Sequence, residues 1–191
     1  ETEREEIVLQ MMKQNAKRIM ADVPWAKALG FELTGIEKGR AFAKVAERVD
    51  NAYYVIAGDR VSDHRPLADS LGLGDRVRFP GVLQGDAMVA AYQQSDLFFS
   101  PSIWEMMPLV VLESMAAGLP AVVTNISGSQ DLVVDGETGF IVEPEDETAL
   151  ANALLELIEH PSIRENFRRA VLSRANDYSW DAISRRYLEL A

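Results

Sequence analysis

Short apolar segments alternate with segments of helical periodicity from residue 53 to residue 190, and this alternation constrains the fold more than any other feature. The first apolar run, residues 53–57, ends at a glycine, as expected of a strand buried on both faces. Strands separated by helices require crossover connections, so the pattern predicts an α/β fold with a parallel sheet covered by helices on both faces. Further strands are predicted at residues 77–79, 97–100, 121–124 and 139–142, and helices at 64–71, 87–94, 109–117, 146–159, 162–174 and 180–190.

The first fifty residues follow a less regular pattern. Residues 5–21 have an apolar stripe at helical spacing that Pro24 ends, and residues 31–36 form an apolar run that predicts a strand. Apolar residues in the segment 40–49 recur at i, i+3, i+4 and i+7, which indicates a helix. We expect residues 1–30 to be an appended helix and connector, and residues 31–191 to be the main domain.

The composition excludes several functional classes. Thirty acidic residues against nineteen basic ones leave a net charge of −11, which argues against a broad surface for nucleic acid or anionic lipid. Cysteine is absent, which excludes disulfides, thiolate metal sites and cysteine nucleophiles. The two histidines are too few for most histidine metal sites, and no apolar run approaches the length of a membrane span. We therefore expect a cytoplasmic protein without a bound metal.

Two glutamates flank the predicted start of one helix. Glu105 lies in the loop after the strand at 97–100, and Glu113 lies in the helix that follows. Pro108 suits a helix start because its missing N–H would have no intrahelical partner there. Free N–H groups and the positive end of the helix dipole make such a start a site for phosphate. Two acids around it are therefore positioned to flank a diphosphate.

Residues 100–120 resemble the glutamate-x7-glutamate motif of family 4 glycosyltransferases, which are retaining enzymes with two Rossmann-like domains (the GT-B architecture). The resemblance implies that this chain is the C-terminal, donor-binding half, and that it binds a nucleotide-diphosphate sugar with no cofactor and no metal. It implies that Glu105 contacts hydroxyls of the donor sugar and that Glu113 accepts hydrogen bonds from the ribose. Many members have Gly-Phe-Gly where this chain has Met106-Met107-Pro108.

Other segments resemble the same family between residues 52 and 191. The strand-then-glycine turn at Ala57-Gly58-Asp59 and the segment 71–81 are similar to stretches of the family. The resemblance implies that the loop after residue 81 borders the base. Lys38-Gly39 resembles a turn whose lysine holds the donor diphosphate with an upstream arginine. That arginine is missing here, so the diphosphate clamp is either incomplete or supplied by Arg40 or Arg60. The resemblance predicts Glu105 as a catalytic residue and the following donor-binding residues: Lys38, Arg40, Gly58, Arg60, Val82, Met107, Pro108, Leu109 and Glu113.

Two alternatives stay open at this stage. The segment 25–51 also resembles the opening of a hot-dog-fold thioesterase, which would require a strand over residues 40–49 and whose usual His-Gly-Gly continuation is missing. The second alternative is that the chain is a non-catalytic nucleotide-binding module or an engineered, chimeric scaffold. In the glycosyltransferase interpretation an N-terminal acceptor-binding domain is missing, so the chain alone should bind donor but transfer poorly. Any peripheral membrane association would come through that missing domain.

Overall fold

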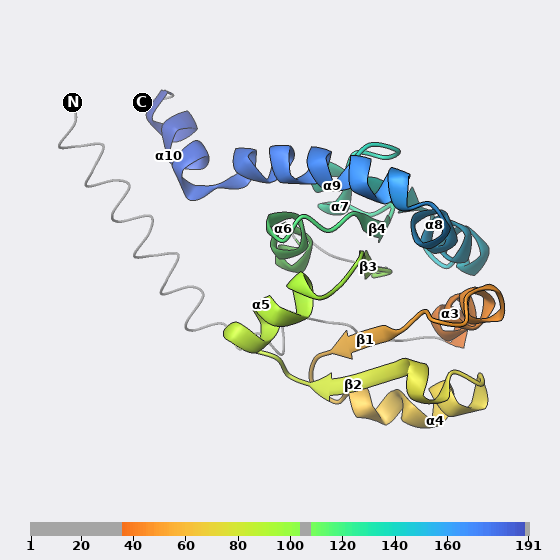
Figure 1. The fold of residues 1–191 in the computed structure, drawn as a ribbon. Helices are drawn as coiled ribbons and strands as arrows, with labels where there is room; N and C mark the ends of the chain where they lie inside the picture. Colours follow the sequence, from red (N-terminus) through yellow and green to blue (C-terminus); the bar gives the residue numbers. More distant parts are fainter. Residues whose placement is uncertain (1–35, 104–107, 190–191) are drawn as a thin grey trace.

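The structure, a computed structural model, describes residues 36–103 and 108–189. Within these residues, five strands lie in two parallel sheets, one with β1 beside β2 and the other in the order β3–β4–β5. Figure 1 shows the two sheets one above the other, with α9 running along the outer side of the second. The strands are β1 (Tyr54–Ala57), β2 (Val77–Gly81), β3 (Phe98–Ser100), β4 (Ala121–Thr124) and β5 (Gly139–Val142).

Helices connect the strands and continue to the C-terminal end of the described chain. Asp146 shows how the sequence starts one of them: its carboxylate accepts hydrogen bonds from the backbone N–H groups of Thr148 and Ala149, at 3.1 and 2.8 Å. The α-helices are α3 (Ile36–Arg48), α4 (Arg65–Ser70), α5 (Asp86–Gln93), α6 (Leu109–Ala116), α7 (Ser129–Leu132), α8 (Glu147–Glu159), α9 (Pro161–Ala175) and α10 (Trp180–Glu189). Three 3₁₀ segments complete the described elements: η1 (Val61–His64), η2 (Gly74–Arg76) and η3 (Asn176–Tyr178).

The predicted α/β class with parallel strands and helices on both faces is confirmed. β4 has all four residues buried: Val122 packs into one apolar cluster with α3 and α8, while Ala121 and Val123 pack into a second cluster with α6. A strand buried on both faces reads as a continuous apolar run, and this is how β4 was predicted. The helix predicted over residues 40–49 is also present, as part of α3.

Four local expectations are corrected. Ile36 was placed in a strand but begins α3, and the turn expected at Lys38-Gly39 lies within that helix. β1 is not buried on both faces, because Val55 is 47% exposed. β2 continues through Pro80 to Gly81, which an edge strand permits because the missing N–H of proline can face away from the neighbouring strand. The short helix α7 was not predicted at all.

Two expectations for the N-terminal region have different outcomes. α3 replaces the strand over residues 40–49 that the hot-dog alternative requires, so the described fold excludes that alternative. Three expectations fall on residues that the structure does not describe: the helix at 5–21, the strand residues 31–35 and the whole 1–30 appendage. The domain boundary at residue 30 therefore stays a prediction.

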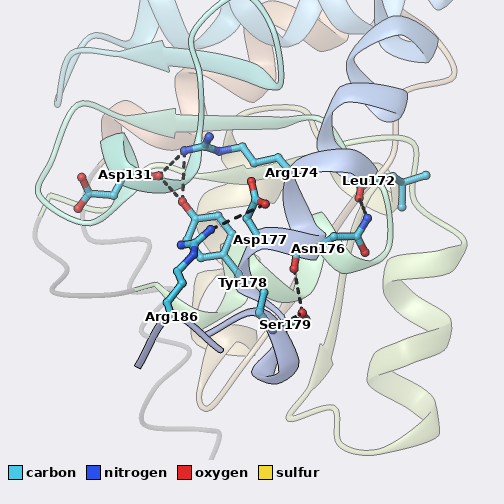
Figure 2. A network of polar contacts seen from close by, with 9 residues as sticks. Asp131, Leu172, Arg174, Asn176, Asp177, Tyr178, Ser179 and Arg186 are labelled. Carbon is cyan, nitrogen blue, oxygen red and sulfur yellow. Dashed lines mark hydrogen bonds and ion pairs between the residues drawn. The ribbon is translucent and has the colours of Figure 1, made fainter. Parts of the chain in front are cut away.

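A polar network attaches the C-terminal helices to the loop after β4 (Figure 2). The guanidinium of Arg174, near the end of α9, donates hydrogen bonds to the backbone carbonyls of Asp131 and Leu132, at 2.6 and 2.8 Å. The Tyr178 hydroxyl donates to the same Asp131 carbonyl at 2.6 Å, and the Arg174 guanidinium also lies over the Tyr178 ring. These contacts join α9 and η3 to α7, which are distant in sequence.

Candidate functional site

The candidate site is the edge where the parallel strands end. β1 and β2 are joined there, because the Gly58 N–H donates to the Gly81 carbonyl at 2.9 Å. β3 and β4 are joined by the Thr124 hydroxyl, which donates to the Ser102 carbonyl and lies 3.5 Å from that of Ser100. In open α/β sheets, ligands bind outside this carboxyl edge. The described loops that carry Gly58, Arg60 and Val82 therefore lie at the edge where a ligand site is expected.

Helix α6 begins at this edge, directly after the loop that follows β3. Pro108 is its N-cap residue, with an extended backbone (φ −75°, ψ 93°), and its carbonyl accepts the first intrahelical hydrogen bond, from Val111 at 3.0 Å. The prediction that Pro108 starts the helix is confirmed. Pro108 is buried and Leu109 is 40% exposed. The first-turn N–H groups of α6 have no intrahelical partners by the geometry of a helix start.

Glu113 lies in the second turn of α6 and is half-buried. The Tyr92 hydroxyl, from α5, donates a hydrogen bond of 2.9 Å to Oε2 of Glu113. Burial raises the pKa of the Glu113 carboxyl above its usual range, and the hydrogen bond from Tyr92 lowers it in part. Burial and the adjacent carboxylate raise the pKa of Tyr92, so its hydroxyl stays protonated and remains a donor. The pair therefore holds one carboxylate oxygen in place.

The sequence did not predict Tyr92. Its contact with Glu113 joins two helices across 21 residues, and no motif or periodicity connects the two positions. The tyrosine also approaches the Val110 carbonyl at 3.5 Å, so it packs along the same turn of α6. Such a contact depends on how α5 and α6 pack together, which spacing along the chain does not encode.

The other predicted residues have different placements. Glu105 and Met107 lie outside the described residues, and so does the Lys38 side chain, although its backbone is in the first turn of α3. Arg40 is exposed on the same helix. Arg60 is exposed in the loop after β1, has a left-handed backbone (φ 55°), and forms an ion pair with Asp63 at 3.1 Å.

Gly58 and Val82, the two remaining predicted residues, lie in the loops that follow β1 and β2. Gly58 is buried at the end of β1 with φ 150°, a conformation that side chains rarely adopt. Val82 follows β2 and is 39% exposed. The hydrogen bond between Gly58 and Gly81 places these two loops side by side. The structure thus brings Gly58 and Val82 together and places Pro108, Leu109 and Glu113 on one helix.

A cavity of about 500 Å³ lies between β1 and β3. Tyr92 lines it, whereas Glu113 does not, so Tyr92 connects the cavity to the carboxylate. Within residues 36–103 and 108–189, no group of three or more His, Asp or Glu side chains is arranged to hold a metal ion. None of the helices in this part of the chain is both long enough and apolar enough to cross a bilayer.

The family model and the curated relatives that match this chain are all glycosyltransferases. A family model described as "Glycosyl transferases group 1" matches residues 39–174. The chain is 34% identical over 126 residues to the D-inositol 3-phosphate glycosyltransferase of Corynebacterium diphtheriae, covering 66% of this chain and 30% of that protein. It is 32% identical over 152 residues to the sulfoquinovosyl transferase SQD2 of Arabidopsis thaliana, covering 78% and 29%. The chain thus spans about three tenths of the length of both relatives.

The fold of this chain also matches that of a solved structure. The crystal structure of Anabaena HepE in complex with UDP matches with a TM-score of 0.73 at 22% identity, covering 88% of this chain and 45% of that one. At this identity the likeness shows the fold alone. The family model, by contrast, covers well over half of the sequence and includes the strands, α5, α6 and the Glu113 turn. The chain belongs to the glycosyl transferases group 1 family.

Proposed function

We propose that this chain is the donor-binding domain of a glycosyltransferase and that it binds a nucleotide-diphosphate sugar at the carboxyl edge of its strands. The observation that carries the proposal is the Glu113 carboxylate: it lies on the helix that begins at this edge, half-buried and held by Tyr92. The family match supports a donor-binding role, and one structural neighbour of the same fold is a complex with UDP.

Glu113 is suited to accept hydrogen bonds from a ribose diol. An ionised carboxylate offers about four acceptor sites on two oxygens, and Tyr92 uses one of them. Hydrogen bonds to a charged group contribute roughly 1.5–3 kcal/mol each. Because Tyr92 restricts the carboxylate to one orientation, less conformational freedom is lost when the nucleotide binds.

The diphosphate would lie against the first turn of α6, whose free N–H groups and dipole favour an anion. Lys38, Arg40 and Arg60 are the predicted cations. The Arg60–Asp63 pair is solvent-exposed, and pairs of this kind contribute about 1 kcal/mol or less, so Arg60 can exchange Asp63 for a phosphate. During transfer the bond between the sugar and the diphosphate oxygen breaks, and these groups stabilise the charge on the departing nucleotide.

Several finer features belong to the same proposal. Glu105 would contact the donor sugar, with Met107, Pro108 and Leu109 beside it, and Val82 would border the base. Transfer would retain the anomeric configuration without a metal ion. Because the matched region spans only about three tenths of each relative, we assign acceptor binding, and any membrane contact, to a domain outside this chain. A cytoplasmic location stays a prediction from the sequence.

Isothermal titration calorimetry with UDP, GDP and ADP, and with their hexose conjugates, tests the assignment. Glu113→Ala should weaken binding of the preferred nucleotide at least tenfold, which corresponds to about 1.4 kcal/mol. Glu165→Ala, on the exposed side of α9, is the matched control and should bind as the unsubstituted chain does. Unchanged affinity in a folded Glu113→Ala variant, judged by circular dichroism, would contradict the proposed role.

A further inference from the structure

Strand β5 lies at one end of the second sheet, because the described strands follow the order β3–β4–β5. Its four residues are Gly-Phe-Ile-Val, and the last three are residue types that favour strands. A strand at the end of a sheet directs a row of backbone N–H and C=O groups away from that sheet, and such a row can pair with a strand of another chain. The outer edge of β5 is therefore a surface on which a second copy of this chain can add.

The register of β5 shows which backbone groups form this outer edge. The Asn125 N–H donates to the Val142 carbonyl at 2.7 Å, so Val142 directs its backbone groups toward β4. Successive residues of a strand direct their backbone groups to opposite sides, so Phe140 also faces β4, whereas Gly139 and Ile141 face outward. The outer edge of β5 thus consists of the backbone groups of Gly139 and Ile141.

The turn at residues 134–138, just before β5, bonds to both of these residues. The Asp135 carboxylate accepts a hydrogen bond from the Ile141 N–H at 2.9 Å, through Oδ1. The Gly136 N–H donates to the Gly139 carbonyl at 2.9 Å, and the backbone of Asp135 forms an isolated parallel bridge with Gly139. The turn therefore occupies the place beside β5 where a strand of a second copy would begin to pair.

Short contacts hold this turn in shape. The Val134 N–H donates to the Thr138 hydroxyl at 2.8 Å, and the Val134 carbonyl accepts from the backbone N–H groups of Glu137 and Thr138 at 3.1 and 2.9 Å. Thr138 is buried, and Gly136 has the left-handed backbone (φ 73°) that the turn requires. The turn is thus fixed against β5, so its two bonds to the strand are held in place by the rest of the turn.

We propose that the turn at residues 134–138 is an edge cap, which prevents β5 from pairing with a strand of a second copy of this chain. The Asp135 carboxylate carries this role at Ile141, because an ionised carboxylate accepts hydrogen bonds but offers no donor that would continue the ladder. Glu137 and Glu143, both exposed, add negative charge before and after β5, and like charges oppose the approach of a second copy. The inference concerns self-association and does not rest on the proposed function.

Sedimentation velocity of the full-length chain over a range of protein concentrations tests the proposal. Asp135→Ala should self-associate at least about tenfold more tightly than the unsubstituted chain, because the Ile141 N–H is then free to pair. Asp135→Asn is the matched control, since it loses the same charge but keeps an oxygen acceptor. Glu137→Ala loses a charge from the same turn. Both controls should behave as the unsubstituted chain does, and an Asp135→Ala variant that associates no more tightly than Asp135→Asn overturns the proposal.

A second substitution separates pairing at the edge from aggregation of a weakened fold. Ile141→Pro removes the outward N–H, and proline is tolerated in edge strands where its missing N–H would face away from the sheet. Combined with Asp135→Ala, it should return self-association to the level of the unsubstituted chain. A weakened fold would instead aggregate more with the added proline. Association that persists or increases in the double variant would therefore show that the edge of β5 is not the surface involved.

Hydrogen exchange at low protein concentration tests the capping bond itself. The Ile141 N–H should exchange at least about tenfold faster in Asp135→Ala than in Asp135→Asn, because only the alanine variant lacks an acceptor for it. The Phe140 N–H, which the register directs toward β4, is the internal control and should exchange equally in the two variants. Equal Ile141 rates in the two variants would show that the Asp135 side chain does not protect this edge.

Discussion

At the scale of single residues, the Glu113–Tyr92 pair combines burial with a fixed hydrogen bond. A carboxyl group at this position loses water on folding, which disfavours its charge, while the tyrosine hydroxyl partly restores what water provided. A group in this balance is sensitive to pH. Its titration therefore reports on the site independently of any assay of sugar transfer.

The raised pKa of Glu113 predicts how stability depends on pH. The folded state holds the proton more strongly than the unfolded chain, so this carboxyl stabilises the fold most below its unfolded pKa, and the contribution is lost as pH rises through the folded pKa. Glu113→Gln cannot titrate. Between about pH 4 and pH 7 its free energy of unfolding, measured in urea, should rise relative to that of the unsubstituted chain. Glu165→Gln should show a constant difference, and a constant difference for Glu113→Gln would contradict the prediction.

Tyr92→Phe removes the hydroxyl and leaves the ring in place. The pKa of Glu113 should then rise further, because the hydrogen bond that lowers it is gone. Nucleotide affinity should fall several-fold, and stability should fall by about 0.5–1.5 kcal/mol. Carboxyl NMR titration, calorimetry and urea unfolding measure the three effects. Tyr187→Phe on α10, whose ring is exposed, is the control. An unshifted Glu113 pKa in Tyr92→Phe would show that the hydroxyl does not orient the carboxylate.

At the scale of elements, several strands and helix starts follow from residues that are adjacent in the sequence. Pro108 begins α6, Asp146 caps α8, and continuous apolar runs become the buried strands β3 and β4. The errors arose where tertiary contacts decide. Val55 alternates onto a face that opens to the cavity, and β2 extends through Pro80 because it lies at an edge of its sheet.

Gly139 lies where β4 and β5 approach closely, so we expect a side chain at this position to lower the free energy of unfolding strongly. It pairs with Ala121 at the start of β5, and a Cβ added there would lie 2.0 Å from the Ala121 carbonyl oxygen. Gly139→Ala should therefore separate β4 from β5 and lower the free energy of unfolding by about 3 kcal/mol or more. Gly136→Ala, where φ is 73° and no atom lies within 4 Å, is the matched control and should cost about 1–2 kcal/mol. Equal losses in urea unfolding would contradict the close-approach explanation.

At the scale of the whole molecule, long-range contacts attach the terminal helices to the sheets. Arg174 joins α9 to α7, and α3 bridges the two sheets through the Phe42 ring. The Tyr54 hydroxyl also donates to the Phe42 carbonyl at 3.2 Å, and burial raises the pKa of Tyr54 to about 12. Such contacts join segments that are far apart in the sequence, and the hydrophobic periodicity of each segment does not predict them.

Arg174→Ala should loosen the C-terminal helices. The substitution leaves the carbonyls of Asp131 and Leu132 without their guanidinium donor, so we expect a loss of about 2 kcal/mol in the free energy of unfolding. Arg168→Ala, exposed on the same helix, should change stability by no more than about 0.5 kcal/mol. Urea unfolding followed by far-ultraviolet circular dichroism measures both. Similar values for the two variants would show that the network of Figure 2 contributes little.

The sequence by itself determined the fold class, the parallel strands and the helix that carries Glu113. The signals for these features are the spacing of apolar residues, the glycines that end strands and helices, and the residues that cap helices, and all of them are local properties of the chain. Its motif spacing also selected the glycosyltransferase family. Only the tertiary structure decided that Tyr92 holds the carboxylate, that Lys38-Gly39 lies within a helix instead of a turn, and that β1 and β3 face each other across a cavity. These features depend on distances between segments remote in sequence, and no periodicity along the chain records such distances.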